Sequence, residues 1–228
     1  MTRFPAFTPV ADAALLVELG DAEDDALNRA VIALDAAIRS ADIVGVIETV
    51  PALVSLLVVF DPLLTDHAAI RAAVSARFPV RTRKGGNARR HRIPVCYDPE
   101  LCPDLPAVAE ATGLSVDAVV EAHLAAELRV AMYGFAPGYA YLTGLPARIR
   151  VPRKPTAVRD VPKGSVIIAG PQCLLTTLTM PTGWSIIGRT PAQVMEGGGD
   201  GGFLFDVGDI VTFARITRAE LPVEMQEP

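Results

Sequence analysis

Residues 165–187, SVIIAGPQCLLTTLTMPTGWSII, contain three short apolar runs that glycine and proline separate. Two more runs of the same kind follow, and helical periodicity is almost absent over this part of the chain. The predicted strands are residues 165–169, 174–178, 184–187, 203–205 and 210–216, with turn signals at 162–164 (PKG), 181–183 (PTG) and 206–209 (DVGD). Closely spaced strands with turns between them predict a small β-barrel or sandwich.

The N-terminal part of the chain has a different pattern, in which strands alternate with amphipathic helices. Apolar residues recur every three or four positions over 24–39, which predicts a helix. A second helix is expected over about 65–77, with Thr65 or Asp66 as its N-cap. The predicted strands are residues 13–19, 45–50, 55–60 and 91–97. The order βαββαβ is that of a ferredoxin-like domain.

Two short helices are predicted after these strands, over 104–112 and 115–127, with Gly113 ending the first and Ser115 capping the second. On the second helix, His123 falls within an apolar stripe. A histidine in such a stripe is more often a hydrogen-bonded core residue than a catalyst. Burial nevertheless lowers its pKa, which would make it a usable base.

The 228 residues are enough for two domains. We place the first over 1–90 and a β-barrel domain over 91–228, with the helical hairpin inserted at about 104–127. The predicted fold class is therefore α+β.

Composition excludes several classes of protein. The net charge of −5 argues against a nucleic-acid binder, which needs a basic surface. No run of about eighteen apolar residues occurs, and the first twenty residues lack the pattern of a signal peptide, so we expect a cytoplasmic protein without a membrane segment. Three cysteines without C-x-x-C spacing indicate reduced, buried thiols and no metal site.

The chain's aromatic residues concentrate in one stretch, VAMYGFAPGYAYLTGLP at 130–146. It holds four of the thirteen aromatic residues (one Trp, four Tyr and eight Phe in all), together with three glycines and two prolines. A stiff loop with amphipathic rings suits a pocket wall or a docking surface. The alternative is a tight corner whose rings fill a core. The candidate pocket residues here are Gly134, Phe135, Pro137, Gly138, Tyr139, Tyr141 and Gly144.

Four more residues complete the candidate binding set: Arg153, Gln172, Trp184 and Arg189. The two arginines could clamp a carboxylate or phosphate together, or each could pair with a structural carboxylate. The basic segment 80–92 could hold a phosphate or an acidic partner, or be a solvated loop. No nucleophile elbow, zinc-binding H-E-x-x-H, Walker A or dinucleotide motif is present.

Several motifs occur in an order that resembles the 5-oxoprolinase B-subunit family, also called allophanate hydrolase subunit 1 or KipI-like. The resemblance covers nearly the whole chain. The motifs are residues 13–21 (AALLVELGD), 91–123 (HRIPVCYDPELCPDLPAVAEATGLSVDAVVEAH), 134–146 (GFAPGYAYLTGLP), 161–170 (VPKGSVIIAG) and 187–191 (IGRTP).

This resemblance implies a ferredoxin-like N-terminal domain followed by a cyclophilin-like β-barrel. It also implies one member of a heteromeric enzyme, which works with homologues of the C and A subunits to couple ATP hydrolysis to the opening of 5-oxoproline to L-glutamate. His123 stands where a histidine of the family usually stands, which makes it the candidate general base. Other members inhibit a sporulation histidine kinase or form the carboxyltransferase part of a biotin-dependent urea carboxylase, so these two functions are alternatives.

Three places depart from the family's usual pattern. Residues 137–142 are PGYAYL where PGFPYL is usual, and Gln172 precedes Cys-Leu-Leu where a segment like QTGIYP is usual. Ala157 and Val158 replace a second Pro-Arg pair, with Arg159 one position late. Such changes alter the hydrogen-bonding groups of a pocket, so the resemblance leaves the identity of the substrate open.

Overall fold

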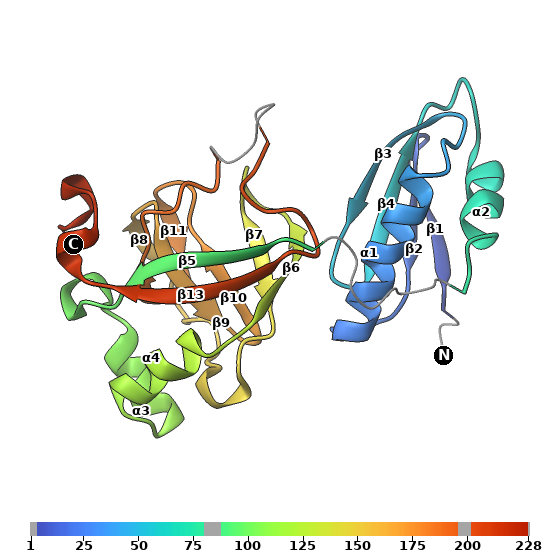
Figure 1. The fold of residues 1–228 in the computed structure, drawn as a ribbon. Helices are drawn as coiled ribbons and strands as arrows, with labels where there is room; N and C mark the ends of the chain where they lie inside the picture. Colours follow the sequence, from blue (N-terminus) through green and yellow to red (C-terminus); the bar gives the residue numbers. More distant parts are fainter. Residues whose placement is uncertain (1–3, 80–87, 196–201, 228) are drawn as a thin grey trace. The chain divides into compact units, whose positions relative to one another are not determined.

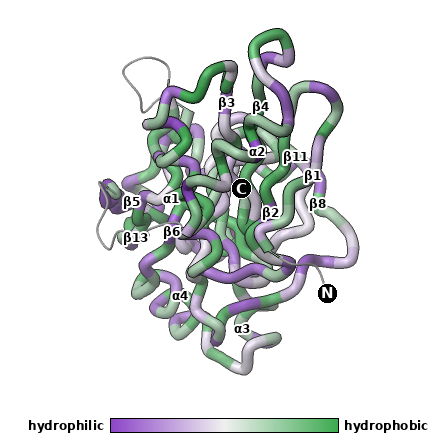
Figure 2. Tube along the Cα trace, turned by 90° about the vertical axis from the view of Figure 1, so that its right-hand side faces the viewer, coloured by the Kyte–Doolittle hydropathy of each residue, from purple (hydrophilic) through white to green (hydrophobic). Residues whose placement is uncertain are grey.

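The computed structural model describes residues 4–79, 88–195 and 202–227. The chain divides into two compact units, residues 1–87 and 88–228 (Figure 1). Hydrophobic and hydrophilic residues alternate along much of the trace (Figure 2), and each unit has its own apolar core. In the described ranges, no helix combines the length and apolar character needed to cross a bilayer.

The N-terminal unit is a four-stranded antiparallel sheet with two helices on one face. Its elements are β1 (Ala6–Val10), β2 (Ala14–Glu18), α1 (Asp25–Arg39), β3 (Val46–Pro51), β4 (Ser55–Phe60) and α2 (His67–Ser75). The strand order is β1-β2-β4-β3. Alternate residues of β2 and β4, such as Val17 and Val58, pack against Leu34 of α1 and Ile70 of α2. Every second residue of the strands therefore packs against the apolar side of the helices, where such residues recur every three or four positions.

An aspartate caps the N-terminus of each helix of this unit. The Asp24 carboxylate accepts hydrogen bonds from the N–H groups of Ala26 (2.7 Å) and Leu27 (2.9 Å), and that of Asp66 accepts one from Ala69 (2.8 Å). These bonds satisfy donors that have no partner within the helix. Of the two caps proposed for the second helix, Asp66 is the one found.

One strand predicted for the N-terminal sheet lies elsewhere. Residues 91–97 do not complete the first sheet, because β5 (Arg90–Cys96) belongs to the barrel. The place of a fourth strand beside β2 is taken by β1, which precedes β2 in the chain and pairs with it antiparallel. The ferredoxin-like arrangement is thus kept with a different strand at its edge. Pro9 and the exposed outer half of β1 weaken its strand signal, and an edge strand tolerates both.

The C-terminal unit is a closed barrel of seven strands in the order β10-β7-β6-β13-β5-β12-β9. The strands other than β5 are β6 (Leu128–Tyr133), β7 (Ala140–Thr143), β9 (Ser165–Ala169), β10 (Gln172–Leu175), β12 (Ser185–Arg189) and β13 (Ile210–Ile216). Strands β8 (Val158–Val161) and β11 (Met180–Thr182) form a separate antiparallel pair. The predicted class of a helix-bearing sheet followed by a barrel is confirmed.

The pair β5 and β13 runs parallel along seven residues, side by side in Figure 1. The other barrel pairs are antiparallel. The predicted strand at 203–205 is wrong, since these residues form no strand. Strands β6 and β7 were not predicted, because glycines and prolines made residues 130–146 read as a loop.

The helical hairpin consists of α3 (Leu105–Thr112) and α4 (Val116–Leu124). Gly113 has φ +68°, the left-handed conformation that ends helices without steric cost to glycine. Ser115 caps α4 by accepting from the Ala118 N–H (3.1 Å). The hairpin residues Val108 and Val119 belong to the same apolar core as the inward residues of the barrel strands.

A buried carboxylate ties the start of β5 to the start of β13. Asp209 accepts from the N–H groups of Arg89 (2.8 Å) and Asp206 (2.9 Å), and it bonds His91 Nε2 (2.8 Å). Burial by itself raises the pKa of the Asp209 carboxyl, but the bonds from Asp206, His91 and Arg89 outweigh it and bring the pKa below its ordinary value.

Removing this carboxylate is expected to destabilise the barrel. Asp209→Ala removes a buried carboxylate and leaves three partly buried donors without their acceptor, so we expect the free energy of unfolding to fall by about 3 kcal/mol in urea denaturation. Asp206→Ala is the control, because among the residues that the structure describes the Asp206 side chain pairs only with the exposed Arg89, and its removal should cost under about 1 kcal/mol. Equal losses in the two variants would contradict the assigned role.

Candidate functional site

The outer side of the barrel carries a second apolar cluster. Leu174 and Ile167 point outward into it, whereas their neighbours Cys173 and Val166 point into the barrel core. Six candidate residues lie here, and together they define what we call the outer aromatic face: Phe135, Tyr139, Tyr141, Arg153, Gln172 and Trp184. Gln172 joins this set because it shares the outward side of β10 with Leu174.

The turn that joins β6 to β7 borders this face and is held by its own backbone. The Gly134 N–H donates to the Tyr139 carbonyl (3.2 Å), and the Tyr139 N–H donates to that of Ala136 (3.1 Å). Thr177 Oγ1 donates to the Pro137 carbonyl (2.8 Å) from outside the turn. Gly138 has φ +73°, and a Cβ there would stand 2.6 Å from Met195 Sδ, so the position requires glycine.

The rings in this stretch divide into buried and exposed ones. Tyr139 is buried, and its hydroxyl donates to Met180 Sδ (2.7 Å). Burial, with a smaller effect of Tyr141, raises the pKa of Tyr139 to about 12, so the phenol is neutral at physiological pH. Tyr139 thus fills a core, as the alternative interpretation expected.

Phe135 behaves differently. Its side chain is 77% exposed, and its φ is +72°, an unusual conformation for a residue with a Cβ. Strained backbone of this kind is concentrated at binding and catalytic sites. An exposed ring on a fixed turn is suited to contact with another molecule.

A cation stands over the single tryptophan. The Arg153 guanidinium lies 5.5 Å from the ring centre of Trp184, and Tyr141 meets the same ring edge-on at 6.1 Å. The neighbouring Lys154 is fixed by its ion pair with Asp104 and by the bond from its N–H to the Gly183 carbonyl (2.6 Å). The face of the Trp184 ring attracts the guanidinium, while the N–H groups of the guanidinium stay available to an anion.

Gly144 and Arg189 lie away from this face. Gly144 has φ +102° at the far end of β7, where a Cβ would approach the Glu127 carbonyl to 3.1 Å, so its role is close backbone packing. Arg153 and Arg189 do not form a clamp, because β12 separates Trp184 from Arg189 by about 16 Å. Arg189 is 5% exposed at the opposite end of that strand, and burial lowers its pKa.

His123 is fully buried, in contact with Tyr97, Cys173 and Phe213 of the barrel unit. Its Nδ1 is hydrogen-bonded to the Tyr97 hydroxyl (2.7 Å), its Nε2 lies 3.6 Å from Cys173 Sγ, and its ring stacks on Phe213 at 4.1 Å. Burial lowers the pKa of His123 to about 3, so the imidazole is neutral. This geometry favours a core histidine over a base in contact with substrate. Sequence reasoning missed its partners, which lie up to 90 positions away.

The basic segment 80–92 was proposed to hold a phosphate or an acidic partner. Residues 80–87 of the basic segment lie outside the described residues, and the next two arginines are paired, Arg89 with Asp206 (2.8 Å) and Arg90 with Glu127. Within 4–79, 88–195 and 202–227, no group of three histidine, cysteine or acidic side chains could hold a metal ion.

Comparison with known proteins gives consistent matches. The family model "Carboxyltransferase domain, subdomain C and D" matches residues 5–203. The B subunit of 5-oxoprolinase from Bacillus subtilis is 33% identical over 229 residues, which cover 96% of this chain and 95% of that protein.

Two solved structures extend the comparison. The protein TTHA0988 is 30% identical with a TM-score of 0.78, over 90% of this chain and 40% of its own, so this chain spans less than half of that protein. The urea amidolyase of Kluyveromyces lactis has a TM-score of 0.77 over 96% of this chain and 15% of its own. At 18% identity, this second likeness concerns the fold alone.

Proposed function

Because the chain belongs to the family of the 5-oxoprolinase B subunit, which is also that of the carboxyltransferase subdomains C and D, we propose that it is a non-autonomous subunit of an ATP-dependent 5-oxoprolinase. In this proposal it acts with homologues of the C and A subunits to open the 5-oxoproline lactam to L-glutamate. Its contribution is one wall of a composite site. The partner covers the outer aromatic face and so completes this site. The three free cysteines are compatible with a reducing, cytoplasmic location.

The observation that carries this proposal is the outer aromatic face itself. It offers rigid rings, the exposed Phe135 and the Arg153 guanidinium over Trp184. None of its six side chains is a nucleophile held by a base, so the face supplies binding groups without a complete reaction centre. Its two exposed members, Phe135 and Arg153, are of residue types that are enriched at the centre of protein interfaces, whereas Tyr139, Gln172 and Trp184 are buried within the unit.

The chemistry assigned to this chain is recognition. In this proposal Arg153 binds the carboxylate of the lactam substrate, and Trp184 and Tyr141 contact its ring; the contacts of Arg153 and Tyr141 with Trp184 support it. ATP hydrolysis supplies the driving force for opening the amide bond, and we assign it to the assembly as a whole. Closure by the partner would remove water from the face and so strengthen the charge contact with Arg153.

Reconstitution tests the proposal. The chain is mixed with homologues of the A and C subunits from the same genome, and glutamate formation from 5-oxo-L-proline with ATP is followed with and without it. We expect turnover to disappear when the chain is omitted. In the complete mixture, Arg153→Gln should lower kcat/KM at least about tenfold while the exposed Arg148→Gln has no effect. Turnover that survives omission of the chain would overturn the proposal.

The carboxyltransferase part of a biotin-dependent urea carboxylase is the second candidate function. The description of the matching family model favours it, since it refers to carboxyltransferase subdomains. Biotin would then be carried by a partner and would reach the same outer aromatic face. Urea-dependent ATP hydrolysis in a reconstituted mixture with a biotinylated partner, abolished by avidin, would support this candidate over the first.

A further inference from the structure

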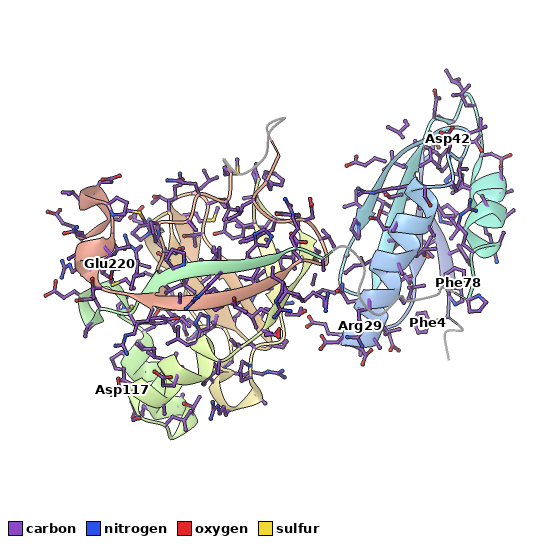
Figure 3. The ribbon with its side chains drawn as sticks, in the orientation of Figure 1. Phe4, Arg29, Asp42, Phe78, Asp117 and Glu220 are labelled. Carbon is purple, nitrogen blue, oxygen red and sulfur yellow. The ribbon has the colours of Figure 1, made fainter. Side chains whose placement is uncertain are left out.

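A pocket of about 490 Å³ lies at the end of the barrel where β5 and β13 both finish. Because these two strands are parallel, the segments that follow them leave from the same end and form the pocket walls. Residues 96–99 form one wall, and residues 215–218 with Glu220 form the other. Glu220 is labelled in Figure 3, on the segment beyond β13. The second wall lies outside the residues 5–203 that the family model matches.

Arginine side chains converge on this barrel end. Arg215 lines the pocket, and within the described ranges its side chain has no hydrogen-bond or ion-pair partner. Arg218 is held in place by Glu100 (2.5 Å), by Asp98 (3.7 Å) and by a bond to the Gln226 carbonyl (2.6 Å). One of these two guanidinium groups is therefore free to bind a ligand, and the other is fixed beside it.

A third arginine, Arg189, adds positive charge near this pocket. Arg189 pairs through its backbone with Cys96, a residue of the pocket wall. Its side chain is buried, and its Nε has no hydrogen-bond partner among the residues that the structure describes. A buried, unsatisfied guanidinium N–H is costly unless a ligand or water satisfies it.

The carboxylates of the pocket limit the negative charge of a ligand that can bind there. Asp98 accepts from the Glu100 N–H (3.1 Å), and Glu220 accepts from the Thr217 N–H and hydroxyl (2.7 Å each). Two carboxylates on the walls disfavour a polyphosphate, because like charges repel at this distance. Two arginines and two carboxylates line the walls, which suits a ligand with one carboxylate and a group that can face a carboxylate.

The floor of the pocket is apolar. Tyr97 lines the pocket although it is only 5% exposed, and its hydroxyl is hydrogen-bonded to Nδ1 of the buried His123 (2.7 Å). Ile216 and Pro99 also line the pocket. A compact carbon skeleton fits against such a surface, whereas a fully hydrated inorganic anion gains nothing from it.

We propose that the barrel-end pocket binds a small amino-acid-like carboxylate, with its carboxylate on Arg215 and its ammonium or amide N–H toward Asp98. The site is distinct from the outer aromatic face, and the proposal does not depend on which reaction the assembly performs. His123 serves this site only indirectly, as the residue that fixes the Tyr97 ring.

Binding to the full 228-residue chain tests this proposal. L-Glutamate, 5-oxo-L-proline and inorganic phosphate are titrated separately by calorimetry, with ¹⁵N NMR to locate the perturbed amides. We expect at least one of the two organic ligands to bind saturably and to shift the amides of residues 96–99 and 215–218. Arg215→Gln should weaken this binding at least about tenfold, and Arg215→Lys should weaken it less.

The matched control is Arg148→Gln, an exposed arginine outside the pocket, which should bind like the parent protein. NMR spectra of the variants also show whether each is folded. Three results would overturn the proposal: no saturable binding of either organic ligand, equal binding by the Arg215→Gln and Arg148→Gln variants, or phosphate binding tighter than both organic ligands. None of them depends on turnover by the assembly.

Discussion

Phe135→Asp is expected to weaken association with the C-subunit homologue about a hundredfold. Phe135 projects from a turn that is already ordered, so little conformational entropy is lost when a partner covers it. Central aromatic residues of interfaces typically contribute about 2–4 kcal/mol, and about 3 kcal/mol corresponds to a hundredfold change in Kd. A buried, unpaired aspartate adds a desolvation cost to the lost contact.

Phe135→Asp should remove the ring without changing the shape of the turn. Residue 135 has positive φ, and aspartate enters this region more readily than most residues, so the turn should keep its shape. Leu63→Asp is the matched control, because Leu63 is 91% exposed and belongs to the N-terminal unit. Affinity is measured by calorimetry or by biosensor with the purified C-subunit homologue. A folded Phe135→Asp variant with unchanged Kd would exclude Phe135 from the interface.

Acid should destabilise the barrel through His123. Its pKa is lowered to about 3 in the folded state, from an ordinary value of 6.5, because the ring is buried. Between these two values the unfolded chain binds a proton that the folded chain does not, so the free energy of unfolding falls as the pH falls. One pKa unit corresponds to about 1.4 kcal/mol, so lowering the pH from 7 to 4 costs about 3 kcal/mol through this residue alone.

The comparison with His123→Gln isolates this contribution. Glutamine cannot titrate, so the stability difference between the parent and the variant should narrow by about 3 kcal/mol between pH 7 and pH 4. Trp184 is the single tryptophan and lies in the barrel unit, so its fluorescence in urea follows that unit. His67→Gln, in the other unit, is the control. Parallel pH profiles for the parent and the His123→Gln variant would contradict the buried, neutral state of His123.

Local signals in the sequence were sufficient for the helices and for several strands. The carboxylates at Asp24 and Asp66 and the left-handed Gly113 act within one turn of their own position, so the sequence around them identifies the helix ends. β4 and β9 were predicted at their observed bounds, because β-branched runs and flanking turns mark them.

Pairing between distant segments could not be predicted in the same way. The sequence of β5 fits either sheet, and its membership follows from the contact with β13, about 120 residues later. The partners of His123 come from Tyr97, Cys173 and Phe213, which no spacing rule connects. The separation of Arg153 from Arg189 depends likewise on which strand runs between them. The composition of the turn at 134–139 indicated a surface feature, but not which ring would be exposed.

β13 is the last barrel strand in the sequence, so the barrel can close only at the end of synthesis. β13 lies between β6 and β5, so the ring of strands stays open until residues 210–216 have emerged from the ribosome. The last strand of the N-terminal sheet ends at Phe60 and its second helix at Ser75, so that unit can fold while the rest is still being translated. During synthesis the incomplete barrel exposes two unpaired strand edges, and chaperones that shield such edges would act on this half of the nascent chain.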